Sequence, residues 1–197
     1  VARTYAANPS GITIGAGVDH VAEAQPPHWN TSTLTYRIAN CPQSLDCAEA
    51  QRALRDAFAA WDAVSGISLS EVRRGGDIIV SFEVDDHGDG TAFDGPGGFA
   101  AHAIYPYTSG AEAIDGDIHF DDTETWVTSD APAPFPREAH LPTIALHEIG
   151  HALGLPHSDA PDTVMWPTYV GPRTLTPADV RAIQEIFGTP DEEQAAE

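Results

Sequence analysis

The stretch from His147 to Ser158 constrains the fold and chemistry of this chain more than any other. It reads His-Glu-Ile-Gly-His-Ala-Leu-Gly-Leu-Pro-His-Ser. On an α-helix, residues at positions i and i+4 leave the same face one turn apart, so His147 and His151 are placed to bind one tetrahedral zinc ion. Glu148 follows the first histidine and is free to act on a water molecule rather than on the metal.

Gly154 and His157 complete this pattern. Gly154 can adopt the left-handed conformation that ends a helix, which would turn the chain back and supply His157 as a third ligand. Three protein ligands leave a fourth position for water, as in catalytic rather than structural zinc sites. The alternative is an ordinary amphipathic helix with core or surface histidines. The glutamate, the glycine and the third histidine in register favour a zinc hydrolase site.

The size and charge of the chain limit its organisation and its partners. A chain of 197 residues suits one globular domain with short extensions. With 30 acidic residues against 9 basic ones, all of them arginine, the formal charge is −21. This charge argues against nucleic acid and anionic membranes as partners. No apolar run approaches the ~20 residues that span a bilayer, so we expect no membrane insertion.

The two cysteines, Cys41 and Cys47, are separated by a loop that contains Pro42. Because Cys-x5-Cys is not a standard zinc-binding spacing, we favour a small disulfide over free thiols. A disulfide is typical of proteins outside the cytosol, so we expect a secreted, extracellular protein.

Hydrophobic periodicity divides the chain into an extension, a domain and a tail. Residues 1–28 lack sustained periodicity and are predicted to be an N-terminal extension or a pro-segment, residues 29–189 the domain, and residues 190–197 a flexible acidic tail. Apolar spacings of three and four predict helices, and alternation or short apolar runs predict strands. The predicted helices are 47–64, 138–153 and 176–187, and the predicted strands are 34–38, 67–72 and 78–82.

Residues 85–126 are dense in Asp, Gly and His and leave room for little more than two short strands. A loop this long with few core residues needs something else to hold it, and metal ions suit its side chains. Converging histidine and aspartate favour a closed structural zinc site, whereas carboxylates alternating with glycine carbonyls favour calcium. The alternative is a solvated acidic loop with turn glycines. The candidate zinc ligands are His87, Asp89, His102 and His119.

Several motifs in register resemble the catalytic domain of the matrix metalloproteases, the matrixin branch of the metzincins. Ser158 is the matrixin residue after the third zinc histidine, Met165 matches the methionine turn of the family, and Pro167 and Tyr169 match the wall of its specificity pocket. The resemblance covers about residues 28–188. It implies an α+β fold with a twisted, mostly parallel five-stranded sheet, one antiparallel edge strand, three helices, and a zinc cleft between an upper and a lower subdomain.

The resemblance also implies metal ions beyond the catalytic zinc. These are one structural zinc ion on the four ligands named above and one or two calcium ions. The first calcium site would use Asp94, Gly95, Gly97, Phe99, Asp121 and Glu124, and the second would use Asp77, Ala113, Asp115 and Asp117. Asp179 matches a helix aspartate that supports the methionine turn in the family.

The activity that the resemblance implies is hydrolysis of peptide bonds in protein or peptide substrates by a monomeric enzyme. Glu148 would act as general base on the zinc-bound water, and a hydrophobic side chain after the cleaved bond would fill the pocket. The substrate is expected to pair with the edge strand over residues 100–103. A small residue at position 143 suggests a roomy pocket. The predicted substrate-binding residues are Ala100, Ala101, Thr143, Pro167 and Tyr169.

The chain departs from the family pattern in its N-terminal segment and in its last helix. The family's pro-segment places a cysteine on the zinc, but no cysteine precedes Cys41. Asp19 or His20 is then the candidate blocking residue, and a loose or surface-packed extension is the other interpretation. Ala178 replaces an aspartate that pairs with the mature N-terminus in the family, which makes that salt bridge doubtful here. The alternative function is a latent or non-catalytic metal-stabilised binding module.

Overall fold

The computed structural model describes residues 13–16, 28–106, 114–130 and 138–190. The helices are α1 (Cys47–Asp62), α2 (Leu141–Ala152) and α3 (Pro177–Phe187). The strands of the main sheet are β1 (Thr13–Ala16), β2 (Thr33–Ile38), β3 (Ser68–Glu71), β4 (Ile78–Glu83), β5 (Phe99–Ala103) and β6 (Ile118–Asp121). Strands β7 (Thr125–Val127) and β8 (Glu138–His140) form a second, two-stranded sheet.

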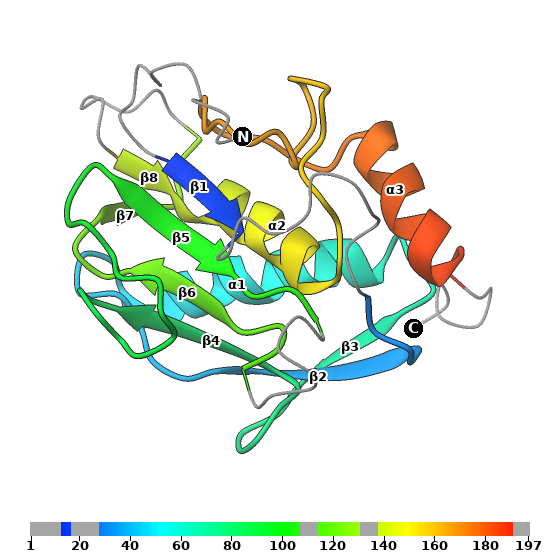
Figure 1. Ribbon diagram of the computed structural model, residues 1–197, viewed down its shortest axis with the longest axis horizontal. Coiled ribbons are helices and arrows are strands. Elements are labelled where there is room, and N and C mark those ends of the chain that lie inside the picture. The colour runs from blue at the N-terminus through cyan, green and yellow to red at the C-terminus, as the bar shows by residue number, and fades with distance from the viewer. Residues whose placement is uncertain (1–12, 17–27, 107–113, 131–137, 191–197) are drawn as a thin grey trace.

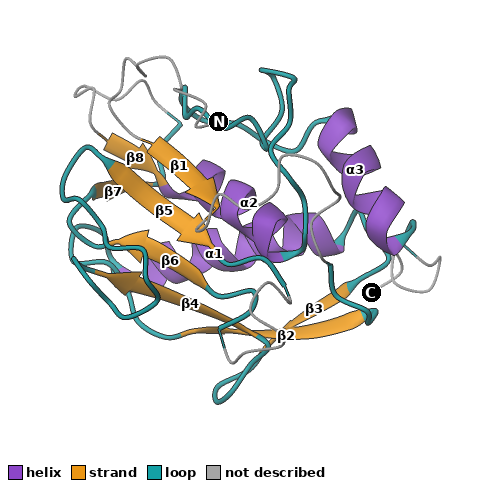
Figure 2. Cartoon of the chain, viewed as in Figure 1, coloured by secondary structure: helices purple, strands orange, loops and turns teal. Residues whose placement is uncertain are grey.

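The helices lie on one side of the twisted main sheet. Figure 1 shows α1 and α2 behind the strands and α3 beside them, and Figure 2 shows the same layers coloured by secondary structure. The indole Nε1 of Trp61 in α1 donates to the carbonyl of Leu146 in α2 at 2.9 Å, and both residues are buried. Within the described ranges, no helix has the length and apolar character that crossing a membrane requires.

The main sheet follows the order β1-β5-β6-β4-β2-β3, and β5 runs antiparallel to β6 while the other neighbours are parallel. The five strands from β5 to β3 confirm the predicted mostly parallel sheet with one antiparallel strand. Among these five strands the antiparallel strand β5 is the edge, as predicted, but the sheet gains a sixth strand that was not predicted. Strand β1 pairs outside it in parallel, with Ile14 opposite Ala101 and Ala16 opposite Ala103.

The other predicted elements exist, with shifted ends. The helix predicted from residue 138 begins at Leu141, because Glu138–His140 pair with β7 as a strand. Pro142 then occupies the first helical turn, where its missing N–H breaks no helical hydrogen bond. Helix α3 begins as predicted after Thr176, whose hydroxyl and the Asp179 carboxylate cap each other's backbone N–H groups.

A disulfide joins Cys41, in the loop before α1, to Cys47, the first residue of α1. The loop that it closes contacts the turn after β6. The backbone N–H and the side-chain amide of Gln43 donate to the two carboxylate oxygens of Asp122 at 2.7 and 2.8 Å. Ser44 donates to the carbonyl of Glu124 at 2.9 Å. The disulfide loop therefore braces the acidic segment next to the sheet.

Candidate active site and metal centres

The C-terminal end of α2 turns the chain back as the glycine pattern predicts. Gly154 has a φ of 105°. The N–H of Gly154 donates to the carbonyl of His151 at 2.9 Å, and the N–H of Leu155 donates to that of Gly150 at 2.8 Å. These two bonds form a Schellman motif, which satisfies carbonyls that the helix would leave unpaired. The reversal brings His157 back toward the helix.

The ligand atoms of His147, His151 and His157 all lie within 4.8 Å of one another. The Nε2 atoms of the fully buried His147 and His151 are 3.0 Å apart. Their Nδ1 atoms lie 2.8 Å from the carbonyls of Val164 and Leu155, respectively. Nδ1 therefore carries the proton in both rings, and the two Nε2 lone pairs face each other. Only a shared cation makes that arrangement favourable, so these residues fit a bound zinc ion.

Burial keeps these histidines in the neutral form that binds metal. Burial, with His157 as the second cause, lowers the pKa of His147 to about 3. Burial, followed by the charges of His147 and His157, lowers the pKa of His151 well below its ordinary value. Protons therefore compete weakly with a metal ion for these nitrogens at neutral pH. Glu148 follows His147 on the same helix and is fully buried.

Met165 packs against α2 in a turn that Asp179 holds. A Cβ atom added at Gly150 would meet the Met165 sulfur at 2.4 Å, so the methionine lies against the helix backbone between the two ligand histidines. The Asp179 carboxylate accepts the N–H groups of Val164 at 3.1 Å and Met165 at 3.4 Å. Because the carbonyl of Val164 faces His147, Asp179 is linked to a candidate zinc ligand through this turn.

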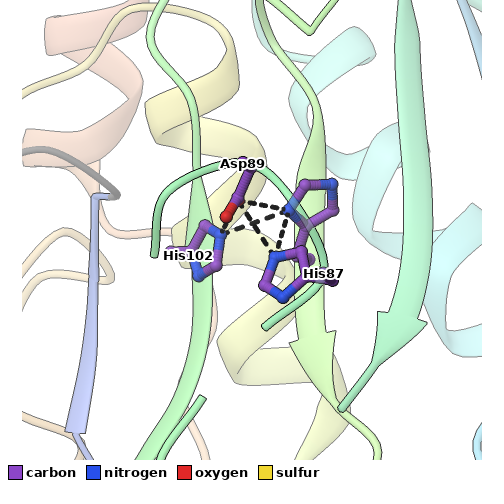
Figure 3. Close-up of side chains that lie close together, drawn as sticks. His87, Asp89 and His102 are labelled. Carbon is purple, nitrogen blue, oxygen red and sulfur yellow. Dashed lines mark hydrogen bonds and ion pairs between the residues drawn. The ribbon is translucent and has the colours of Figure 1, made fainter. Parts of the chain in front are cut away.

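A second cluster forms where the loop after β4 meets β5 and β6, and Figure 3 shows its side chains converging. Asp89 Oδ2 lies 3.0 Å from His87 Nε2, 2.7 Å from His102 Nε2 and 2.8 Å from His119 Nδ1. His119 Nδ1 lies 3.1 and 3.2 Å from the other two histidine nitrogens. A tetrahedral zinc ion with bonds of about 2.0–2.1 Å separates its ligand atoms by about 3.3 Å. The four side chains therefore fit a closed zinc site.

The charges in this second cluster also suit a metal. Burial opposes ionisation of Asp89, but hydrogen bonds from the Thr91 N–H and from His102 hold its pKa below its ordinary value. Burial lowers the pKa of His102 to about 4 and lowers the pKa of His119 as well. A carboxylate among neutral imidazoles carries one negative charge, which a divalent cation offsets.

A pocket lies between α2 and the segment that follows the methionine turn. The Thr143 hydroxyl accepts the backbone N–H of Arg173 at 2.7 Å, and the Tyr169 hydroxyl accepts that of His140 at 3.2 Å. The sequence predicted Thr143 and Tyr169 as pocket residues but not Arg173. Arg173 lies far from Thr143 in the sequence and belongs to no motif that would mark it. Pro167 is not among the lining residues. The lining consists of Thr143, Val164, Trp166, Thr168, Tyr169, Val170, Gly171 and Arg173.

The predicted substrate strand is in place, but β1 covers it. Ala100 and Ala101 lie on β5 and are fully buried. One side of β5 pairs with β6 and the other with β1. Both hydrogen-bonding edges of β5 are therefore occupied.

Comparison with known proteins identifies the group to which these features belong. The matrixin profile matches residues 28–188. The chain belongs to the matrixin family. It is 40% identical to human neutrophil collagenase over 167 residues, which are 82% of this chain and 34% of that protein. It is also 40% identical to human matrix metalloproteinase-20 over 167 residues, 82% of this chain and 32% of that protein.

A third matrixin relative gives the same picture. The chain is 38% identical to macrophage metalloelastase of Rattus norvegicus over 179 residues, 88% of this chain and 36% of that protein. The chain thus spans about a third of the length of these relatives. The comparison therefore identifies the family of this domain.

The first predicted calcium site of this matrixin lies at the turns around β5 and β6. The Asp94 carboxylate accepts the N–H of Phe99 at 2.7 Å, and that of Glu124 accepts the N–H of Gly97 at 2.7 Å. Burial raises the pKa of Glu124, and the charges of Asp121 and Asp94 act in the same direction. Among the described residues, Asp121 Oδ2 is buried without a hydrogen-bond partner. A cation would offset both effects.

The second predicted calcium site is less completely described, because Ala113 lies outside the described residues. Asp77 accepts the N–H of Thr35 at 2.7 Å. Burial raises the pKa of Asp117 to about 6, and the neighbouring Asp115 carboxylate acts in the same direction. Where side chains are described, neither calcium set forms a group of ligand atoms all within 4.8 Å, as the two histidine clusters do.

Proposed function

We propose that this matrixin is a secreted zinc-dependent endopeptidase that cleaves peptide bonds followed by a hydrophobic residue. One observation carries the proposal: two buried imidazoles, His147 and His151, direct their Nε2 lone pairs at each other 3.0 Å apart, with Glu148 buried on the same helix. Three histidine ligands leave a coordination position for a water molecule, as a hydrolytic zinc site requires. The names of the relatives, two of them a collagenase and a metalloelastase, support proteins as substrates.

In this mechanism the protein holds the ligands and moves a proton. Zinc bound by the three histidines would lower the pKa of a water molecule and polarise the scissile carbonyl. Glu148 takes the proton from the attacking water and delivers it to the leaving amine. The carbonyls of Val164 and Leu155 keep the His147 and His151 rings in the ligand tautomer. The pocket beside α2 takes the side chain after the cleaved bond.

The test is the isosteric change Glu148→Gln, which keeps the shape of the side chain but cannot accept a proton. We expect kcat/KM for a peptide with leucine after the scissile bond to fall by about 10³-fold. Zinc content, measured by atomic emission, stays equal to that of the wild type. A peptide with aspartate at the same position serves as the specificity control. Unchanged cleavage by the variant would contradict the role of Glu148 as general base. Equal cleavage of both peptides would contradict the assignment of the pocket beside α2 to a hydrophobic side chain.

A second candidate, a latent form, is favoured by the position of β1. A substrate strand that pairs with β5 needs a free edge, and β1 and β6 occupy both of them. With β1 in this position, a substrate strand would have to displace it from β5. The candidate zinc-blocking residues Asp19 and His20 lie outside the described residues.

Latency is tested in the full chain with Ile14→Pro, because proline removes a backbone donor and fits poorly inside a strand. We expect cleavage at least about 10-fold faster than in the wild type, approaching the rate of a chain that begins at Trp29. Arg74→Pro, in the exposed bend between β3 and β4, is the matched control and should leave the rate unchanged. Equal rates for all four proteins contradict latency. Zinc-loaded protein that stays inactive even without residues 1–28 favours the non-catalytic binding module.

A further inference from the structure

Tyr105 is placed against the outer nitrogen of a candidate zinc ligand. It lies two residues after the end of β5, and only 9% of its surface is exposed. Its hydroxyl lies 3.1 Å from His151 Nδ1 and 3.2 Å from the carbonyl of Leu155. The rings of Tyr105 and His151 meet edge to face, with centroids 5.4 Å apart. The contact is thus both polar and steric.

The directions of the hydrogen bonds follow from the role of His151. Its Nε2 points toward His147, so Nδ1 carries the proton and donates to the Leu155 carbonyl at 2.8 Å. The Tyr105 hydroxyl donates to the same carbonyl and presents its oxygen lone pairs toward the Nδ1–H group. The imidazole N–H is therefore held between two oxygens. One oxygen comes from the turn that ends α2, and the other comes from the sheet.

Tyr105 itself is anchored independently of α2. The neighbouring Ile104 donates its N–H to the carbonyl of Asp117 at 2.9 Å and accepts the N–H of Gly116 at 2.9 Å. These two bonds tie the end of β5 to the segment that leads into β6. A hydroxyl fixed in this way can hold the His151 ring against rotation from the side of the sheet, in addition to the Leu155 carbonyl from the turn that ends α2.

We propose that Tyr105 is a positioning residue of the active site, whose hydroxyl fixes the orientation of His151 and thereby slows the loss of zinc. The proposal rests on the zinc site of the proposed function. Outer partners of ligand histidines typically change metal affinity by 10- to 100-fold. Because the Leu155 carbonyl still accepts from Nδ1 when the hydroxyl is removed, we expect an effect at the lower end, about 10-fold.

The experiment uses Tyr105→Phe in the full chain, which removes the hydroxyl and keeps the ring. Tyr36→Phe is the matched control, because Tyr36 is a buried tyrosine of the core whose ring stacks on Phe58. Tyr105→Leu removes ring and hydroxyl together. Zinc release into excess chelator is measured for each zinc-loaded protein, together with the visible absorption spectrum of the cobalt-substituted form and the Tm of the metal-free form.

The expected result is about 10-fold faster release of one zinc ion from Tyr105→Phe, a shifted cobalt spectrum, and an unchanged metal-free Tm. Tyr36→Phe should match the wild type in release rate and spectrum. Release and spectrum equal to the wild type in Tyr105→Phe overturn the proposal, even if Tyr105→Leu differs, because the contact is then one of packing alone. A wild-type protein that binds no zinc at His147, His151 and His157 would instead overturn the proposed function first.

Discussion

The two histidine clusters use similar side chains, but the fold supplies them in different ways. The proposed catalytic cluster, formed by His147, His151 and His157, comes from α2 and the turn that follows it. The second cluster comes from the loop after β4 and from two strands, within residues 87–119. The first brings together three ligands and the second four. An open site built on a rigid helix suits chemistry, whereas a closed site between distant segments suits folding.

The surroundings of the second cluster strengthen this distinction. His87 stacks on Phe93, and His102 stacks on Phe99, so a few aromatic rings close around the ligands. The loop after β4 has few other apolar side chains in the core. A bound metal would therefore join this loop to β5 and β6 in place of a hydrophobic core. The catalytic cluster lies on α2, whose buried residues already pack against α1 and the sheet.

The strongest test of this distinction between a site for chemistry and a site for folding is to remove one ligand from each cluster. We expect His147→Ala to lower kcat/KM by at least about 10³-fold, because the zinc no longer activates water, and to leave folding nearly unchanged. We expect His119→Ala to lower the Tm by about 10 °C, because metal binding there contributes to folding free energy. Calorimetry and peptide cleavage on the same zinc-loaded samples measure both effects.

Zinc stoichiometry is the control for this pair of variants. Each variant should retain one of two zinc ions. The comparison is wrong if His119→Ala keeps the wild-type Tm after losing a zinc ion, or if His147→Ala unfolds as readily as His119→Ala.

The two clusters also differ in how far the sequence could predict them. The spacing of His147 and His151 places them on one helical face, so the sequence alone identified the candidate ligands and the turn at Gly154. The second cluster was predicted only from residue types and the family resemblance, because its ligands meet through strand pairing. His102 and His119 lie opposite each other on β5 and β6, a register that spacing along the chain does not reveal.

Contacts between distant segments account for what the sequence did not predict. The strand β1 forms because β5 offers an edge, and Thr13–Ala16 shows no periodicity that marks it in advance. The residues Glu138–His140 were predicted to be helical, but pairing with β7 determines their conformation. Tyr105 and His151 lie far apart in the sequence, and no periodic pattern links them, so only the fold reveals their contact. Local patterns predicted the ligands, and tertiary pairing determined their surroundings.

A smaller and more selective effect should come from Asp179, which is linked to the catalytic cluster but not to the second one. Its carboxylate accepts the N–H groups of Val164 and Met165, and the Val164 carbonyl faces His147. In Asp179→Asn, one acceptor oxygen becomes an amide donor that opposes a backbone N–H. We expect one zinc ion to leave about 10-fold faster while the other leaves at the wild-type rate.

The matched control is Asp62→Asn, since Asp62 at the end of α1 also accepts a backbone N–H, that of Leu69 at 2.6 Å. Stopped-flow release of both zinc ions into a chromogenic chelator resolves the two rates in each protein. Because the Asp179 carboxylate contacts the turn behind His147 and not the second cluster, a variant that speeds both releases equally would mean general loosening of the fold. In that case the two clusters are not independent, and the distinction between a site for chemistry and a site for folding does not hold.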